Sequence, residues 1–267
     1  TSPIYWNPME YFRTKDGIRK YVKITEELGK RATRQVGITY LDKQKQLYDA
    51  SDLLLPNSKT EAELLSKHFD IPISHQHVVP NAVDERFAEA TPDLFEETYG
   101  LSDFILFVGV LSPRKNIIRM LRALSDIERN IVLVGPGEDE YIAKCQAAAG
   151  TDVHFVGSID HESPLLGSAY AACDTFVLPS WYETPGLAAL EAGLAGANIA
   201  ITDRGSTQEY FQDYAWYLDP ADGDSIRSAV SSALSSDTDG ALANRIWENY
   251  RWSDTARETT VAYNRVR

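Results

Sequence analysis

The feature that most constrains this chain is a strand, loop, helix and strand pattern between residues 176 and 211. Residues 176–178 form a short apolar run, which predicts a buried strand. Pro185 and Gly186 are then placed to open a helix, because proline lacks only an N–H that would have no partner at a helix start. A second apolar strand is expected at 197–201, directly after the helix. The segment therefore predicts part of a parallel α/β sheet.

The same alternation runs through most of the chain. Strands are predicted at 104–108, 131–134, 153–156, 175–178 and 198–202, and helices at 116–126, 138–149, 163–172 and 186–195. Short apolar strands separated by helices predict a doubly wound parallel sheet of the Rossmann-like α/β class.

The pattern before residue 84 is less regular. Residues 16–35 are compatible with a helix, and 53–55 predict a short strand. Ser58 and Glu61 have the spacing of a capping box, which predicts a helix over 58–68. These 83 residues are too few for a second complete Rossmann-like domain, but they have the elements expected for the end of one.

Two acidic residues flank the predicted start of the helix after residue 185. Glu183 lies in the loop, and Glu191 follows about one turn inside the helix. A carboxylate accepts hydrogen bonds from hydroxyls in pairs, so each can bind a diol. Gly186 between them lets a ligand approach free backbone N–H groups, where the helix dipole favours an anion. This layout suits a sugar nucleotide, and the alternative is two ordinary solvated glutamates.

Arg114 and Lys115 follow the first strand of the predicted sheet. The carboxyl ends of parallel strands define the ligand crevice in such sheets, so these cations are candidates for binding a diphosphate without a divalent metal. A solvated pair is the alternative. No metal-binding spacing of His or Cys is present, and Gly135-Pro136-Gly137 lacks the rest of a dinucleotide fingerprint, so neither a metal nor NAD is expected.

Several segments together resemble the retaining GT-B glycosyltransferases of family 4. The resemblance covers about residues 50–267 and rests on the Glu183-x7-Glu191 pair and on five further segments in the family's order. These are VVPNAVD at 78–84, FVGVLSPRKN at 107–116, IVLVGPGED at 131–139, VHFVGSID at 153–160 and LLGSAYAACDTFVLPS at 165–180.

The resemblance implies a role for each candidate site residue. Glu191 would bind the ribose hydroxyls, and Glu183 would bind the donor sugar. Gly186 and Leu187 would offer N–H groups to the phosphates, and at Gly109 the backbone would pass close to the donor. The list of expected catalytic residues is Glu183, Lys115 and Arg114, with Ser158 as a further donor-binding residue near the base.

One position departs from the family pattern. The family usually carries an arginine directly after the glycine of the first loop, and this chain has Val110 there. Either Arg114 compensates for the missing arginine, or the donor site is weaker.

The resemblance also implies a domain organisation. Residues 84–250 would form the C-terminal nucleotide-sugar domain, residues 1–83 part of the N-terminal, acceptor-side domain, and residues 251–267 a helix returning to that domain. The rest of the N-terminal half is expected either earlier in a longer polypeptide or in another chain.

Charge is unevenly distributed along the sequence. The net charge is −13, but residues 13–45 hold ten Lys or Arg against four Asp or Glu. An acidic chain of this kind is not expected to bind nucleic acid. The basic segment has two interpretations: peripheral contact with anionic lipid or a lipid-linked acceptor, or a solvated helical face.

The sequence predicts a cytoplasmic protein, since no signal-peptide pattern and no apolar stretch of membrane-spanning length is present. Cys145 and Cys173 have no metal or redox spacing and are interpreted as free thiols.

The expected activity is transfer of a hexose from a nucleoside-diphosphate sugar to a saccharide or lipid-linked acceptor, without a metal or other cofactor. The segments ITDRGSTQEYF and DYAWYLDP resemble those of bacterial enzymes that build surface polysaccharides such as O-antigen. Mannosyl transfer from GDP-mannose is therefore the first hypothesis, and transfer from a UDP-hexose the second. A non-catalytic sugar-nucleotide-binding or partner-interaction module is the alternative from another class, and a sugar-nucleotide epimerase is a third.

Overall fold

The structure is a computed structural model that describes residues 44–267. The described residues divide into two compact units, one of residues 44–80 with 256–267 and the other of residues 81–255. The helix predicted at 16–35 lies outside the described residues, as does nearly all of the basic segment 13–45. Within the described part of the chain, no helix is both long and apolar enough to cross a membrane.

The unit of residues 81–255 is built on six parallel strands in the order β3-β2-β1-β4-β5-β6. The strands are β1 Phe104–Val108, β2 Ile131–Val134, β3 Val153–Gly157, β4 Cys173–Leu178, β5 Asn198–Thr202 and β6 Trp216–Leu218. In the central pairs Ile105 lies opposite both Ile131 and Thr175. The prediction of a doubly wound parallel sheet is confirmed.

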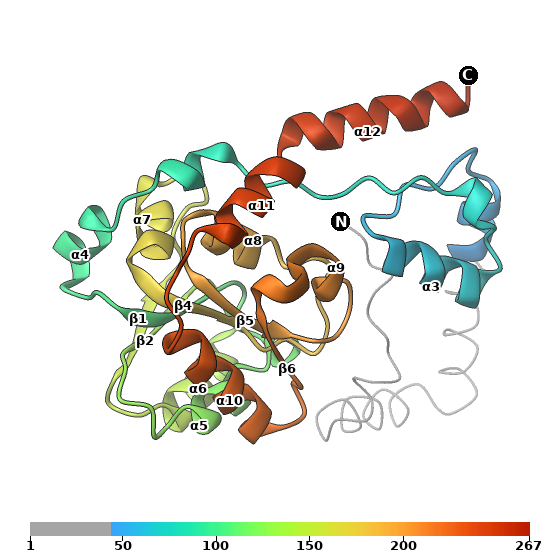
Figure 1. The fold of residues 1–267 in the computed structure, drawn as a ribbon. Helices are drawn as coiled ribbons and strands as arrows, with labels where there is room; N and C mark the ends of the chain where they lie inside the picture. Colours follow the sequence, from blue (N-terminus) through green and yellow to red (C-terminus); the bar gives the residue numbers. More distant parts are fainter. Residues whose placement is uncertain (1–43) are drawn as a thin grey trace, which may run out of the picture. The chain divides into compact units, whose positions relative to one another are not determined.

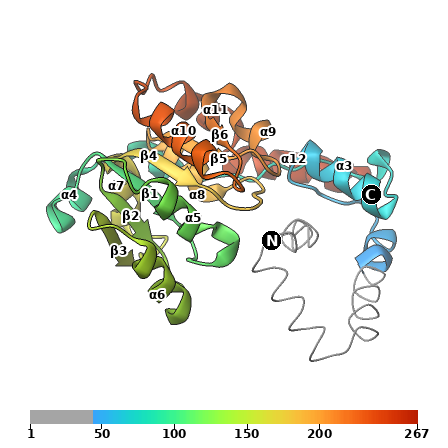
Figure 2. The ribbon, with the colours of Figure 1, turned by 90° about the horizontal axis from the view of Figure 1, so that it is seen from below.

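Helices cover both faces of this sheet. α5, α6 and α10 pack together on one face, and α7 and α8 cover the other face together with α4 and α11 (Figure 1, Figure 2). The helices of this unit are α4 Asp93–Tyr99, α5 Ile117–Ala123, α6 Asp139–Ala148, α7 Pro164–Ala172, α8 Leu187–Leu194, α9 Thr207–Phe211, α10 Gly223–Leu234 and α11 Ala241–Asn249; α12 Trp252–Arg265 begins in this unit and ends in the other. Short 3₁₀ turns are η3 Glu85–Glu89, η4 Pro113–Lys115 and η5 Gln212–Tyr214.

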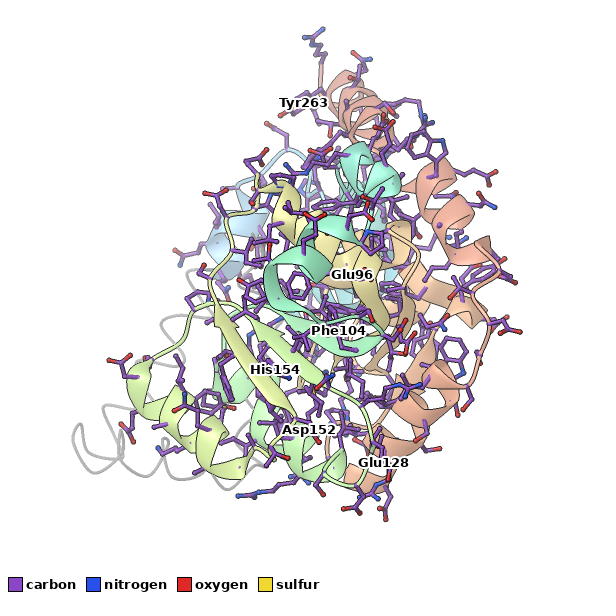
Figure 3. All side chains as sticks on the ribbon, turned by 90° about the vertical axis from the view of Figure 1, so that its left-hand side faces the viewer. Glu96, Phe104, Glu128, Asp152, His154 and Tyr263 are labelled. Atoms are coloured by element: carbon purple, nitrogen blue, oxygen red, sulfur yellow. The ribbon has the colours of Figure 1, made fainter. Side chains whose placement is uncertain are left out.

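The core of the unit lies where the strands contact both helix layers. Phe104, Phe107 and Phe176 are fully buried, and such continuous apolar strands are typical of a sheet that is covered on both faces. Figure 3 shows Phe104 inside the unit, whereas Glu128 and Asp152 lie at its outer edge. The inner strands therefore fix the positions of the loops that follow them.

The described part of the other unit contains α3 Lys59–Phe69, η2 Ile73–His75 and a small apolar cluster of Tyr48, Leu65, Phe69 and Ile71. The capping prediction is confirmed, because the Ser58 hydroxyl accepts from the Glu61 N–H at 3.0 Å. In the described residues, the strand predicted at 53–55 is reduced to an isolated bridge between Leu54 and Gln76.

Most boundaries of the strands and helices lie close to the predicted ones, with a few differences. β4 begins at Cys173, two residues earlier than expected, and α5 ends at Ala123 rather than near 126. β6 and α10 were not predicted individually. Asp222 accepts a hydrogen bond from the Asp224 N–H and so begins α10 with a side-chain cap.

Candidate functional site

The order in which successive strands are added to the sheet reverses between β1 and β4. β1 is followed by β2 on one side, whereas β4 is followed by β5 on the other, although β1 and β4 are neighbours. The loops after these two strands therefore diverge, and ligands of open α/β sheets bind in the crevice that such a switch point leaves at the carboxyl ends of the strands.

Close backbone packing shapes the loops after β1 and β2. Gly135 has φ 140°, and a Cβ atom there would lie 2.0 Å from the carbonyl oxygen of Gly109. Gly109 itself has φ 149°, and the Leu111 N–H donates to the Pro136 carbonyl at 2.7 Å. Gly135 is thus required by the close contact between the loops, and Gly109 is favoured by its positive φ.

The loop after β1 brings two cations to the first predicted carboxylate. The Lys115 Nζ lies 2.5 Å from the Glu183 Oε1, and the Arg114 Nη1 lies 3.6 Å from the same oxygen. The Trp181 N–H also donates to the Arg114 carbonyl at 3.1 Å, so the loops after β1 and β4 are joined by backbone as well. The structure therefore brings Lys115, Arg114 and Glu183 together, with the side chain of Glu183 largely buried.

The loop after β5 fixes the backbone of Glu183. The Glu183 N–H donates to the Arg204 carbonyl at 3.2 Å, and the Ser206 N–H donates to the Glu183 carbonyl at 3.0 Å. Gly205 lies between these bonds with φ 101°, and a Cβ atom there would lie 2.0 Å from the Glu183 carbonyl oxygen. Sequence reasoning missed this role of Gly205, although a glycine soon after a predicted strand is a recognised sign of close backbone approach.

The start of α8 lies between the two glutamates in the chain. Gly186 precedes the helix with φ 92°, and a Cβ atom there would approach Leu178 to 3.0 Å and Ile201 to 3.3 Å. Leu187 is partly exposed, and in the part of the chain that the structure describes no group accepts a hydrogen bond from its N–H or from that of Ala188. These N–H groups and the helix dipole can receive an anion.

Glu191 is held by two side chains that sequence reasoning did not assign to the site. Its Oε2 accepts a hydrogen bond from the Tyr170 hydroxyl at 2.8 Å, and its Oε1 lies 3.0 Å from the His161 Nε2. The hydrogen bond to Glu191 is the main reason that the pKa of His161 is raised above its usual value. Burial, followed by the charge of Glu191, raises the pKa of Tyr170 well above its usual value.

Tyr170 is buried in the core, and its hydroxyl also orients Glu191. His161 is one of the histidines that have no metal-binding spacing in the sequence. Its link to Glu191 joins residues 30 positions apart through the turn after β3, and the sequence carries no periodic signal for such a contact.

Two further predicted positions lie at the edge of this arrangement. Ser158 is exposed in the loop after β3, and no described hydrogen bond joins it to either glutamate. Val110, where the family pattern has an arginine, is 54% exposed after Gly109. The cationic groups described near Glu183 are accordingly those of Arg114 and Lys115.

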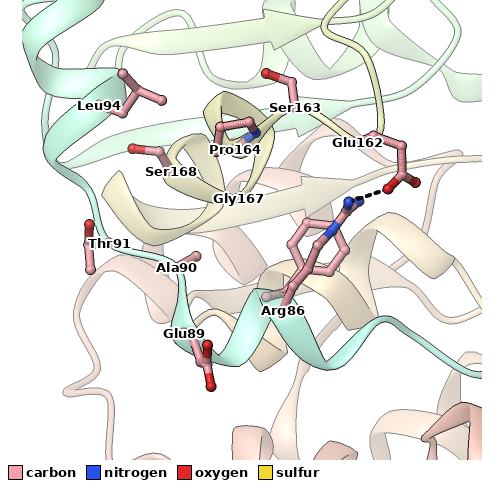
Figure 4. Close-up of a pocket in the computed structure, with 11 residues that line it drawn as sticks. Arg86, Glu89, Ala90, Thr91, Leu94, Glu162, Ser163, Pro164, Gly167 and Ser168 are labelled. Atoms are coloured by element: carbon pink, nitrogen blue, oxygen red, sulfur yellow. Dashed lines mark hydrogen bonds and ion pairs between the residues drawn. The ribbon is translucent and has the colours of Figure 1, made fainter.

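Two depressions in this unit lie away from the strand-end crevice. One pocket of about 370 Å³ lies between η3, α4 and α7, and Figure 4 shows Arg86 and Glu162 facing one another at its side. The converging charges and free N–H groups, rather than pocket size, place the candidate site at the strand ends. Among the described residues, no group of three or more His, Cys, Asp or Glu is arranged to hold a metal ion.

Sequence comparisons give matches along most of the chain. The "O-antigen chain mannosyltransferase B" of Escherichia coli is 26% identical over 247 residues, which is 85% of this chain and 64% of that protein. An "uncharacterized glycosyltransferase" of Methanocaldococcus jannaschii is 30% identical over 187 residues, which is 63% of this chain and 47% of that protein. The chain thus spans about half to two-thirds of the length of these relatives.

Solved structures share the fold. A sucrose-phosphate synthase from Thermosynechococcus elongatus matches with a TM-score of 0.75 at 22% identity, over 85% of this chain and 61% of that one. The Anabaena protein HepE, solved in complex with UDP-glucose, matches with a TM-score of 0.72 at 16% identity, over 85% of this chain and 68% of that one. These likenesses confirm the prediction of a GT-B-type fold class.

The profile of the glycosyl transferases of group 1 matches residues 96–251, which include every strand of the sheet and the whole candidate site. With more than half of its length matched, the chain belongs to the group 1 glycosyltransferase family.

Proposed function

We propose that residues 81–255 bind a nucleoside-diphosphate sugar and that the protein transfers the hexose of this donor to an acceptor hydroxyl. The observation that carries the proposal is the convergence of Lys115 and Arg114 on the buried Glu183 at the switch point of the sheet. Glu191 lies on α8, the helix that follows the loop of Glu183. Membership in a glycosyltransferase family supports the same activity.

Each part of the donor has a chemically matched group in this arrangement. The diphosphate would lie at the N–H groups of Leu187 and Ala188, the ribose diol would bind Glu191, and the sugar hydroxyls would bind Glu183. The Lys115 ammonium has three N–H donors, so it can hold Glu183 and a phosphate oxygen together.

Catalysis would consist of positioning the reactants and stabilising the departing diphosphate. As the bond between the sugar and the phosphate breaks, negative charge grows on the leaving phosphate oxygen. Lys115, Arg114 and the start of α8 would stabilise that charge without a metal ion. Transfer would retain the anomeric configuration, as the family resemblance implies. Glu183 would act as a ligand of the donor sugar, with its carboxylate held by Lys115.

The first hypothesis for the donor is GDP-mannose, and the second is a UDP-hexose. The match to an O-antigen mannosyltransferase supports the first, and the fold likeness to a protein solved with UDP-glucose is compatible with the second. The acceptor would be a saccharide or lipid-linked saccharide. The residues that bind the acceptor are expected in an N-terminal half, because the relatives are longer than this chain. Contact of residues 13–45 with a membrane surface stays a prediction.

Calorimetry tests the proposal directly. UDP, GDP, UDP-glucose and GDP-mannose would be titrated into the metal-free protein and into the Glu191→Ala and Lys115→Ala variants. One nucleotide series is expected to bind the parent protein, and both variants should lose most of that affinity. A folded protein that binds none of these compounds would contradict the proposal.

The exposed Val110 favours a second candidate function, a non-catalytic module that binds a sugar nucleotide or a partner. The two candidate functions are distinguished by assaying sugar transfer with a chain that includes a complete N-terminal half. Transfer would support the enzyme, whereas nucleotide binding without transfer would support the module.

A further inference from the structure

The carboxylate of Glu191 is held from two sides by residues of different mobility. Tyr170 is 1% exposed and is fixed by edge-on contacts with Phe87 and Phe176, at centroid distances of 5.5 and 6.0 Å. The side chain of His161 is 54% exposed. Tyr170 is therefore a fixed anchor for one carboxylate oxygen, and His161 is a movable, titratable partner for the other.

The second ring nitrogen of His161 has two competing neighbours. Its Nδ1 lies 3.1 Å from the Arg86 Nη2 and 3.2 Å from the Glu162 Oε1. Arginine can only donate and an ionised glutamate can only accept. The neutral imidazole therefore donates from Nε2 to Glu191 and accepts from Arg86 at Nδ1, whereas the imidazolium donates to Glu191 and to Glu162. The charge of His161 decides which neighbour it bonds.

Charged groups on three elements surround this ring. Glu191 on α8 and Glu162 in the same turn raise the pKa of His161, with the hydrogen bond to Glu191 as the largest influence. Burial and Arg86 on η3 act in the opposite direction. Arg86 is itself paired with Glu162 at 2.7 Å (Figure 4) and also donates to the His161 carbonyl, which fixes the turn.

We propose that His161 is a positioning residue of the donor site, which sets the orientation and the acceptor strength of Glu191 toward the ribose diol. The inference rests on the proposed binding of a sugar nucleotide. With neutral His161, Glu191 keeps its full charge and free lone pairs for two hydroxyls. The imidazolium forms a charge-assisted hydrogen bond to the same carboxylate, which makes Glu191 a weaker acceptor for the ribose hydroxyls. Donor affinity is therefore expected to rise as the pH rises through the pKa of His161.

The test is the pH dependence of donor binding, measured by calorimetry with UDP-glucose and GDP-mannose. The phosphates of these compounds do not titrate between about pH 5.5 and 8.5, the range in which histidine does. The parent protein is expected to bind its donor about threefold to tenfold more tightly at the upper end of this range. His161→Gln keeps an N–H donor but cannot titrate, so its affinity should be independent of pH.

Tyr170→Phe is the matched control, because it removes the other hydrogen bond to Glu191 without removing a histidine. It should bind the donor more weakly at every pH while keeping the pH dependence of the parent. Glu162→Gln should move the midpoint to lower pH, because it removes the negative charge that favours the imidazolium.

The outcomes separate the inference from the proposed function. Tight binding that is independent of pH, or His161→Gln with the parent's pH dependence, would overturn the role of His161 and leave the donor site standing. Failure of the parent to bind either sugar nucleotide at any pH would overturn both.

Discussion

The two ends of the same sheet differ in chemistry. At the carboxyl ends of the strands, Lys115 and Arg114 converge beside the start of α8. At the amino ends of β1, β4 and β5 lies a depression of about 470 Å³, whose lining includes Asp103 and Asp174 together with Glu96 and Asp237. This depression is thus lined by acids, which repel an anionic nucleotide. Charge and free N–H groups, and not volume, therefore identify the donor site.

Removing a cation from each end tests this comparison most strongly. Lys115→Ala leaves the buried Glu183 with only the more distant Arg114, at the place where the diphosphate is expected. Removing one partner of a buried, hydrogen-bonded charge pair between a protein and its ligand, here Lys115 and the expected phosphate, typically costs about 2–5 kcal/mol of binding free energy. We expect the affinity for the sugar nucleotide to fall about 100-fold or more in calorimetry.

Arg129→Ala is the control at the other end, where Arg129 pairs with Asp174 at 3.5 Å. It should leave the affinity for the donor unchanged. Equal losses in the two variants would mean that the nucleotide does not distinguish the two ends of the sheet.

Alanine substitutions at two glycines, Gly205 and Gly196, compare a position that contacts Glu183 with one that has no close neighbour. Gly205 and Gly196 have similar φ values of 101° and 103°, but their surroundings differ. A Cβ atom at Gly205 would lie 2.0 Å from the Glu183 carbonyl oxygen, whereas a Cβ atom at Gly196 would meet no atom within 4 Å. Alanine at either site is strained, but Gly205→Ala must also displace Glu183. We expect chemical denaturation to show a loss of about 3 kcal/mol for Gly205→Ala and about 1 kcal/mol for Gly196→Ala.

Donor binding by the folded fraction provides the second readout for these glycines. It should decrease in Gly205→Ala and stay unchanged in Gly196→Ala. A Gly205→Ala protein that is as stable as Gly196→Ala would contradict the contact between the loops after β4 and β5.

A neutral replacement of the ribose ligand should have a smaller effect. Glu191→Gln preserves the size of the side chain and one acceptor oxygen but removes the charge that binds the diol. Because a hydrogen bond to a charged group is about twice as strong as a neutral one, we expect a roughly tenfold loss of affinity. Titration of the free nucleoside and of the sugar nucleotide should show the same loss, because both contain the ribose.

The smallest effect is expected at the acidic end. Burial, and then the charge of Asp103, raises the pKa of Asp174. The folded protein therefore holds this proton more tightly than the unfolded chain, and stability falls as the pH rises from the usual pKa of 3.8 through the raised value. Asp103→Asn removes the repulsion, and asparagine tolerates the φ of 53° at this position. At neutral pH we expect a gain of about 0.5 kcal/mol or less, measured as a rise in Tm of roughly 1–2 °C.

The same measurement at about pH 3, where the raised pKa of Asp174 leaves that side chain protonated and uncharged, should show almost no difference between Asp103→Asn and the parent. A gain of equal size at both pH values would assign the effect to the altered backbone preference and not to charge.

Local patterns were sufficient to predict the sheet but not the whole site. The apolar runs at 104–108 and 131–134 end at the same residues as β1 and β2, since strands buried on both faces have an uninterrupted apolar sequence. β6 was missed because Trp216–Leu218 is only three residues long and partly exposed. Local periodicity cannot identify so short a strand, whose place depends on pairing with β5.

Local sequence patterns likewise predict only some of the site residues. Glu183, Glu191 and Gly186 lie within one short segment, so their spacing made them candidates from the sequence. Gly205 and His161 join the site only through contacts across loops that the fold brings together. No periodic pattern in the sequence encodes such contacts, so they can be identified only from the structure.

The most direct measurement is a crystal structure of the protein with whichever sugar nucleotide binds in calorimetry. We expect the diphosphate within hydrogen-bonding distance of the Leu187 N–H and of Lys115, with the ribose hydroxyls on Glu191. A donor bound at the acidic end of the sheet, or in the pocket beside Arg86, would contradict the assignment of the donor site to the switch point.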